Sequence, residues 1–137
     1  MNSVPSGFEP VSRTSPFAEL IGPVYQKPDA SLLILAIRAE RKHCNVRGHV
    51  HGGVLGTLAD IAMGHSTAFS TNPPTPLVTV NLSIDFAGKA ELGDWIEIHT
   101  DVLKVGRNLA FANCHFQVGG ARIARASAVF SIPAHQP

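Results

Sequence analysis

The chain has 137 residues, and 45% of them are hydrophobic, which is enough to bury the core of one domain of ordinary size. The 11 basic and 10 acidic residues leave a net charge of +1, which argues against nucleic acid or an anionic membrane as the main partner. Two cysteines are too few for a disulfide framework, and no apolar run reaches the roughly 18 residues of a membrane span. Residues 1–30 also lack the pattern of a signal peptide, so we expect a soluble, cytoplasmic protein.

The first part of the chain differs in composition from the rest, and we expect an N-terminal arm with a short helix over residues 1–30 and a single folded domain over residues 31–137. Residues 1–16 contain three prolines together with Ser and Gly, a composition that predicts a loose arm. Ser15 is suited to cap a short helix with Pro16 at its first position, and the following Gly-Pro pair would end it.

The most distinctive stretch is residues 45–69, in which a polar, glycine-bearing loop leads into an apolar helix. A strand is predicted just before it, at residues 32–41, which are rich in Leu and Ile. The apolar residues of the helix cover more than one stripe, a pattern that is typical of a helix enclosed by other structure. Asp60 interrupts this run, and no Lys or Arg lies three or four residues away to pair with it. Because an unpaired buried carboxylate is costly, we infer that Asp60 is kept for function.

Two consecutive prolines at positions 73 and 74 must end the helix, and alternating apolar and polar residues then predict four strands. The short turns Gly106-Arg107-Asn108 and Gly119-Gly120 predict antiparallel hairpins. A first strand, one long helix and an antiparallel meander indicate an α+β fold in which the sheet curls around the helix. The four predicted strands are residues 77–86, 95–105, 109–118 and 122–132.

Gly52 and Gly53 lie where the loop becomes the helix, so their N–H groups are among the unpaired donors of the first turn and could bind an oxyanion. The alternative is that two glycines merely make a tight turn. Gly53 and Asp60 are seven residues apart, which separates them by ~10 Å along the helix. If both act on one carbonyl, Asp60 must come from a second, antiparallel copy of the helix, and this geometry predicts a homodimer with two composite sites at its interface.

The spacing of Asn45, His51-Gly52-Gly53 and Leu58-Ala59-Asp60 resembles the hotdog-fold thioesterases of the PaaI-like, 4-hydroxybenzoyl-CoA thioesterase superfamily, and the resemblance covers about residues 31–132. It implies a hotdog fold with a long central helix wrapped by a curved antiparallel sheet of five or six strands. It also implies hydrolysis of an acyl-CoA, either aryl or short to medium chain, to the free acid and CoA. No metal or redox cofactor is then required, and the expected assembly is a homodimer or a homotetramer made of two dimers.

The resemblance also implies roles for single residues. Asp60 would act as general base or nucleophile, and the Gly52 N–H would polarise the thioester carbonyl. Asn45 would orient water or the carbonyl, although an Asn in a loop often serves only as a turn former. Thr79 would assist the water, although Thr also suits a strand through its β propensity. His51 would fix the loop by hydrogen bonding or touch the substrate.

A CoA substrate further implies basic groups at the rim of the pocket, because CoA carries phosphates. Arg107 is the first candidate because it follows Gly106 in a turn, and Lys104, Arg122 and Arg125 are the others. Gly53 would contact the substrate at the start of the helix. Apolar residues near the helix would line the acyl group, although core packing explains them equally well: Ile61, Met63, Phe69 and Phe86.

Other functions remain open from the sequence. A hotdog hydratase or dehydratase would need a positioned His with the acid, and a binding module would sense acyl-CoA without turnover. A mere binding pocket gains nothing from a buried carboxylate, which favours the enzyme. Cys114 is expected as a small core residue. A zinc site is not expected, because the spacing of the candidate ligands fits no common Cys/His set; these are His43, Cys44, His49, His51 and His65.

Overall fold

The computed structural model describes residues 3–29 and 32–133, and within these ranges no helix is long and apolar enough to cross a membrane. Strands and helices fall close to the positions predicted for residues 32–132, and the last three strands begin and end within one residue of the prediction. The elements in chain order are β1 (Glu9–Pro10), α1 (Pro16–Ile21), β2 (Val24–Asp29), β3 (Leu32–Arg38), the 3-10 helix η1 (Arg41–His43), α2 (Gly52–Ala68), β4 (Val78–Phe86), β5 (Trp95–Val105), β6 (Leu109–Val118) and β7 (Ala121–Ser131).

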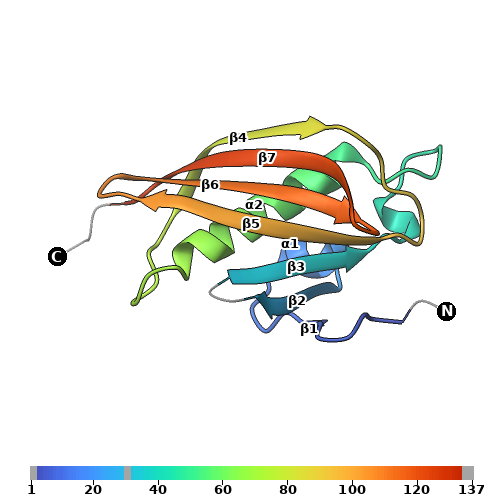
Figure 1. Ribbon diagram of the computed structural model, residues 1–137, viewed down its shortest axis with the longest axis horizontal. Coiled ribbons are helices and arrows are strands. Elements are labelled where there is room, and N and C mark those ends of the chain that lie inside the picture. The colour runs from blue at the N-terminus through green and yellow to red at the C-terminus, as the bar shows by residue number, and fades with distance from the viewer. Residues whose placement is uncertain (1–2, 30–31, 134–137) are drawn as a thin grey trace.

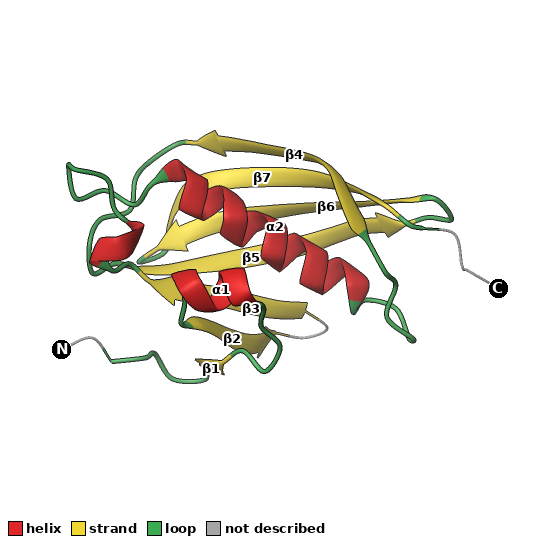
Figure 2. Cartoon of the chain, turned by 180° about the vertical axis from the view of Figure 1, so that it is seen from behind, coloured by secondary structure: helices red, strands yellow, loops and turns green. Residues whose placement is uncertain are grey.

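All seven strands form one antiparallel sheet in the order β1-β2-β3-β5-β6-β7-β4. The sheet curves around α2, which lies along its inner face with the short α1 beside it (Figures 1 and 2). The α+β architecture with a central helix is therefore confirmed. The two predicted hairpins are present, but β4 pairs with β7 rather than with β5, so the four strands do not form a simple meander.

The sheet has seven strands rather than five or six because the N-terminal segment contributes two of them. Residues 9 and 10, which the sequence places in a loose arm, instead form β1 and pair with β2 in the register Glu9↔Gln26. The short helix α1 is confirmed, since the Ala18 N–H donates to Oγ of its cap Ser15 at 3.1 Å. Phe8 explains the attachment of the arm, because its ring packs edge-on against Trp95 of β5 with centroids 5.1 Å apart.

The core lies between one side of α2 and the inner face of the central strands. Leu58 and Met63 of α2 are fully buried, as are Phe116 of β6 and Phe130 of β7. Cys114 is also buried, and burial raises the pKa of its thiol to about 12, which confirms it as an unreactive core residue. The helix is not enclosed on all sides, however. Along its other side the residues are exposed or half-buried, and Asp60 is among these.

Candidate active site

Asp60 lies halfway along α2, on the side of the helix that the sheet leaves partly uncovered. Its Oδ1 accepts a hydrogen bond from Oγ1 of Thr79 on β4, with 2.6 Å between the two oxygens. No Lys, Arg or His forms an ion pair with Asp60 among the described residues. A carboxylate held by one neutral hydroxyl keeps lone pairs free to accept a proton from another molecule. Within this chain Asp60 is half-buried, so the prediction of a buried carboxylate is wrong here, because the sheet covers only the other side of α2.

A β-bulge in β4 gives Thr79 its orientation. Thr79 pairs with Phe130 and Asn81 pairs with Val129, so Val80 is an extra residue without a counterpart on β7. Side chains alternate between the two faces of a strand, and one extra residue reverses that alternation. Thr79 therefore faces the helix together with Leu82, although the two are three residues apart. Without the bulge, a strand with Leu82 packed inward would direct Thr79 away from Asp60.

At the start of α2, the two glycine N–H groups that the sequence predicts as donors differ in their hydrogen bonding. His51 is the N-cap, and its Nδ1 accepts from the Gly53 N–H at 3.3 Å, so that donor is already used. The Gly52 N–H has no acceptor within the described part of the chain. A Cβ added to Gly52 would lie 3.0 Å from Cζ of Phe86, so glycine lets the aromatic ring approach the helix terminus closely. Gly52 thus presents a free N–H beside an apolar ring.

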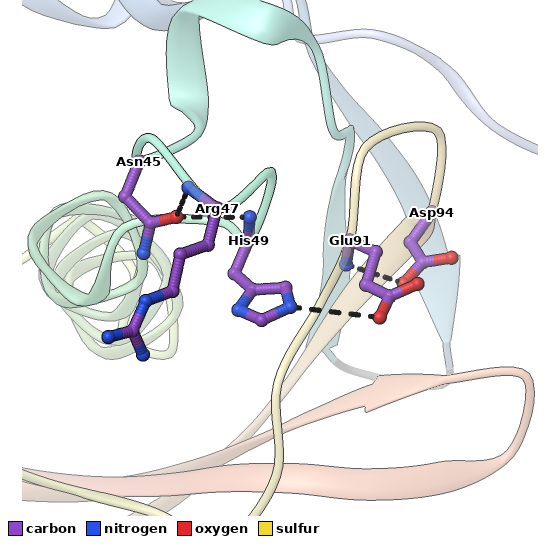
Figure 3. A network of polar contacts seen from close by, with 5 residues as sticks. All are labelled: Asn45, Arg47, His49, Glu91 and Asp94. Carbon is purple, nitrogen blue, oxygen red and sulfur yellow. Dashed lines mark hydrogen bonds and ion pairs between the residues drawn. The ribbon is translucent and has the colours of Figure 1, made fainter.

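Asn45 holds the loop that precedes α2 (Figure 3). Its Oδ1 accepts from the N–H groups of Arg47 at 2.9 Å and His49 at 3.2 Å, which is the geometry of a turn former. The His49 ring reaches Glu91, with Nε2 and Oε1 3.8 Å apart, and so ties the loop to the segment before β5. No hydrogen bond joins Asn45 to the Asp60–Thr79 pair within the described residues of this chain.

Four of the five residues considered for zinc lie in η1 and the loop that follows it, and His65 lies near the far end of α2. His43 is buried and joins η1 to the end of α1, since it accepts from the Glu40 N–H and its other ring nitrogen contacts the Ile21 carbonyl. His65 stacks on Phe69 near the end of α2 with centroids 4.7 Å apart, and burial, followed by the charge of Arg13, lowers its pKa. In the part of the chain that the structure describes, no three His, Cys, Asp or Glu side chains are placed to hold a metal ion.

The candidate residues for lining the acyl group differ in how far their side chains are exposed to solvent. Ile61 is half-buried on α2 and packs against the core, while Met63 is fully buried. Phe69 is 44% exposed at the end of α2, where the Arg13 guanidinium lies 5.0 Å from its ring centroid. Phe86 is 51% exposed at the opposite end of the helix, beside Gly52. Ile61, Phe69 and Phe86 are thus available to a ligand, and Met63 is not.

The candidate basic residues divide between the two ends of the sheet. Lys104 and Arg107 are exposed at the β5–β6 turn. The loop before α2 instead pairs with the segment that precedes β5, through the bridge His49↔Glu91, so Gly52 lies at the other end of β5. Near the start of β7, Arg125 lies at the Gly52 end of the sheet, because its neighbour Ala124 pairs with Phe86.

Sequence reasoning missed two features of this region. The Thr79–Asp60 contact depends on the bulge at Val80, which has no evident signal in a run of β-branched residues. The stacking of His99 on His115 across β5 and β6, with centroids 5.0 Å apart, was also missed. Both histidines sit at alternating positions of predicted neighbouring strands, so the hairpin register alone could have brought them together.

Comparison with known proteins connects this geometry to a family. The profile described as the thioesterase superfamily matches residues 47–131, which include the whole of α2 and β4 to β7. The Pseudomonas aeruginosa protein named "Putative esterase PA0474" is 48% identical over 134 residues, covering 97% of this chain and 100% of that protein. Acyl-coenzyme A thioesterase 13 of Mus musculus is 35% identical over 81 residues, or 59% of this chain and 57% of its own length.

A solved structure shares the same architecture. Zebra fish thioesterase superfamily member 2 superimposes with a TM-score of 0.80 at 29% identity, over 87% of this chain and 88% of that one. The hotdog fold that the sequence implied is thereby confirmed. Since the profile covers more than half of the chain and the P. aeruginosa relative nearly all of it, this chain belongs to the thioesterase superfamily, and the prediction of a thioester hydrolase is confirmed at that level.

Proposed function

We propose that the protein hydrolyses an acyl-CoA thioester to the free acid and CoA, with Asp60 as the catalytic carboxylate. The observation that carries this proposal is the Asp60–Thr79 pair, a carboxylate on a mainly apolar helix that is held by one hydroxyl at 2.6 Å. Among the described residues no ion pair accounts for this acid, and a second copy of the chain that covered this side of α2 would bury the carboxylate, which is costly unless it has a function. The name of the mouse relative supports CoA as the thiol part of the substrate.

In this mechanism the thioester carbonyl accepts a hydrogen bond from the free Gly52 N–H, which stabilises the negative charge that develops on its oxygen. Asp60 either takes the proton of an attacking water or attacks the carbonyl itself. The C–S bond then breaks, and the thiolate of CoA leaves and is protonated. In the water route the acid forms in the same step, whereas in the nucleophilic route the acyl group stays on Asp60 as an anhydride until a water molecule hydrolyses it and regenerates the carboxylate. Thr79 donates to Asp60 and can accept from the water, so it would orient both.

The remaining predicted site residues have supporting roles in this proposal. His51 occupies the Gly53 N–H and so directs the substrate to Gly52, while Gly53 gives the substrate space at the helix start. Asn45 shapes the loop beside the carbonyl and could orient it with its amide nitrogen. Ile61 and Phe69 would line the acyl group, whether aryl or aliphatic, and Lys104 and Arg107 are candidates for the phosphates of CoA.

The site is proposed to be completed by a second copy of the chain. Gly52 and Asp60 are eight residues apart on one helix, or ~12 Å along its axis, so one carbonyl cannot contact both. β4 is an edge strand of the sheet, and its Val78 and Val80 are 55% and 56% exposed. Antiparallel pairing of two β4 edges would bury these valines and bring Gly52 of one subunit toward Asp60 of the other. We therefore expect a homodimer, and a tetramer if two dimers associate.

The first test is release of free thiol from a panel of aryl and alkyl acyl-CoAs, for the native protein and for Asp60→Asn. The substitution keeps the shape of the side chain and removes its charge. We expect kcat to fall a hundredfold or more, equivalent to roughly 3 kcal/mol, while circular dichroism shows an unchanged fold. Absence of turnover by the native protein, together with a rise in Tm on adding acyl-CoA, would identify a binding module and refute the proposal.

The oxyanion role of Gly52 has a matched pair of variants. Gly52→Pro removes the N–H at the first helical position, where proline is tolerated, and the preceding His51 already has the extended ψ of 136° that proline favours. Gly52→Ala adds a Cβ in the same place but keeps the N–H. We expect the proline variant to lose roughly a hundredfold in kcat relative to the alanine variant. Equal kcat values in the two variants would exclude the Gly52 N–H as the oxyanion donor.

A further inference from the structure

The outer face of the sheet, which points away from α2, carries a hollow of about 640 Å³ across β4, β5, β6 and β7. A second hollow of about 300 Å³ shares Asp85, His115, Arg122 and Arg125 with the first, and its lining extends to Phe86. The ring of Phe86 is the group that packs against Gly52 at the start of α2. The two hollows therefore form one depression on the outer face, which reaches the end of β4 that carries Phe86.

Basic side chains converge in this depression. The Arg125 Nε donates to Oδ2 of Asp85 at 3.1 Å, which leaves the two outer nitrogens of its guanidinium free, and its side chain is 81% exposed. Arg122 forms no ion pair among the described residues. His115 lies close to Arg122 and stacks on His99, and burial, followed by the charges of Arg122 and His99, lowers its pKa. Two guanidinium groups thus lie together at the end of the depression near the start of β7, where Asp85 is the carboxylate that lines both hollows.

Two of the acidic groups on this face already have a basic partner, and neither partner is Arg122. Glu97 is occupied by His99, with 3.0 Å between Nε2 and Oε1, and Asp85 is occupied by Arg125. Asp101 lines the larger hollow further along β5. Neutral hydrogen-bonding groups complete the lining, contributed by Ser83, Asn113 and Ser127. A ligand with phosphate groups and several polar atoms would find a partner for each type of group.

We infer that this depression binds the phosphates of CoA, with Arg122 and Arg125 as the residues that hold them. The inference rests on the proposed function and adds to it a binding site for the non-reacting part of the substrate. Arginine suits the task because its planar group donates two hydrogen bonds to one phosphate. Arg125 lies at the same end of the sheet as Gly52 of its own chain. Lys104 and Arg107 lie at the opposite end of the sheet, so they could approach a thioester bound at Gly52 only if they came from the partner subunit.

The test compares an acyl-CoA with the corresponding acyl-pantetheine, which has the same thioester but no phosphates. In the double variant Arg122→Gln/Arg125→Gln we expect KM for the acyl-CoA to rise about tenfold or more, with kcat unchanged. KM for the acyl-pantetheine should stay the same, because the variant loses only phosphate contacts. Lys27→Gln on β2, at the far side of the sheet, removes a positive charge elsewhere and should change neither constant.

Two kinetic results would overturn the inference: an unchanged KM for the acyl-CoA in the double arginine variant, or an equal rise for both substrates. A rise specific to acyl-CoA in Lys104→Gln/Arg107→Gln alone would move the phosphate site to the partner's end of the sheet. Calorimetric titration with CoA itself separates this inference from the proposed function. If no thioester is hydrolysed but CoA binds about tenfold more weakly to the arginine variant, the phosphate site stands and the hydrolase fails. If the native protein and the arginine variant bind CoA with equal affinity, or if the native protein does not bind CoA, the phosphate site is refuted.

Discussion

The strands β4 and β6 belong to the same sheet, and in both the side chains alternate between its two faces. They differ in the number of neighbouring strands and in how deeply their inward side chains are buried. β6 lies between β5 and β7, and its inward residues Ala110, Ala112, Cys114 and Phe116 are all buried. β4 has only β7 as a neighbour, and its inward residues Leu82 and Ile84 are only half-buried. A strand with two neighbours completes the core within one chain, whereas an apolar edge strand is a surface suited to a second molecule.

This difference separates the part of the molecule that maintains the fold from the part proposed to carry the chemistry. The ring of Phe116 is fully buried within a single chain. Thr79 and Val80 lie instead on the open edge strand β4, where Thr79 contacts Asp60 of α2. Substitutions in β6 should therefore act mainly on folding. Substitutions in β4 should act mainly on assembly and turnover.

The largest effect is expected for Phe116→Ala, because this ring is fully buried in the core. Removing it leaves a cavity, and the free energy of unfolding should fall by about 3–5 kcal/mol in denaturant titrations. The matched control is Phe111→Ala on the same strand, where the ring faces outward and is 36% exposed. That change should cost less than about 1 kcal/mol. Equal losses would contradict the difference between the two faces of β6.

A smaller effect, on assembly, is expected for Val80→Lys. A lysine on an edge strand opposes pairing with another strand, so the dissociation constant of the dimer should rise roughly a hundredfold, or about 2.7 kcal/mol. Leu103→Lys is a close control, because Leu103 is also 56% exposed and also lies in a bulge, but on the interior strand β5. Sedimentation would measure the assembly, and a Val80→Lys protein that stays dimeric would disprove pairing through β4.

The smallest effect is expected for Thr79→Val, which keeps the branched shape and removes the hydroxyl that donates to Asp60. We expect kcat to fall about tenfold with little change in KM, because the carboxylate and the water lose their orientation. Thr79→Ser keeps the hydroxyl and should retain most of the activity. An unchanged kcat in the valine variant would mean that Thr79 serves only the strand.

Much of the fold could be predicted because its signals are local. Ser15 and Pro16 indicate a helix start, and the glycine turn before Leu109 indicates a hairpin, within a few residues of chain. Asp60 could be chosen as a candidate because an acid in an apolar helix is itself unusual. The loose arm was a wrong prediction at β1, because the ring of Phe8 finds its partner Trp95 more than eighty residues along the chain.

The sequence alone determined the helices, the hairpins and the choice of Asp60 as the acid, since each depends on the conformational preferences and polarity of adjacent residues, while the choice of Gly52 came from the family resemblance. Only the tertiary structure decided that β4 pairs with β7 and that a bulge at Val80 directs Thr79 toward Asp60. It also decided that the ring of Phe86 packs against Gly52 at the start of α2. These contacts join segments that are far apart in the chain, so no local pattern encodes them.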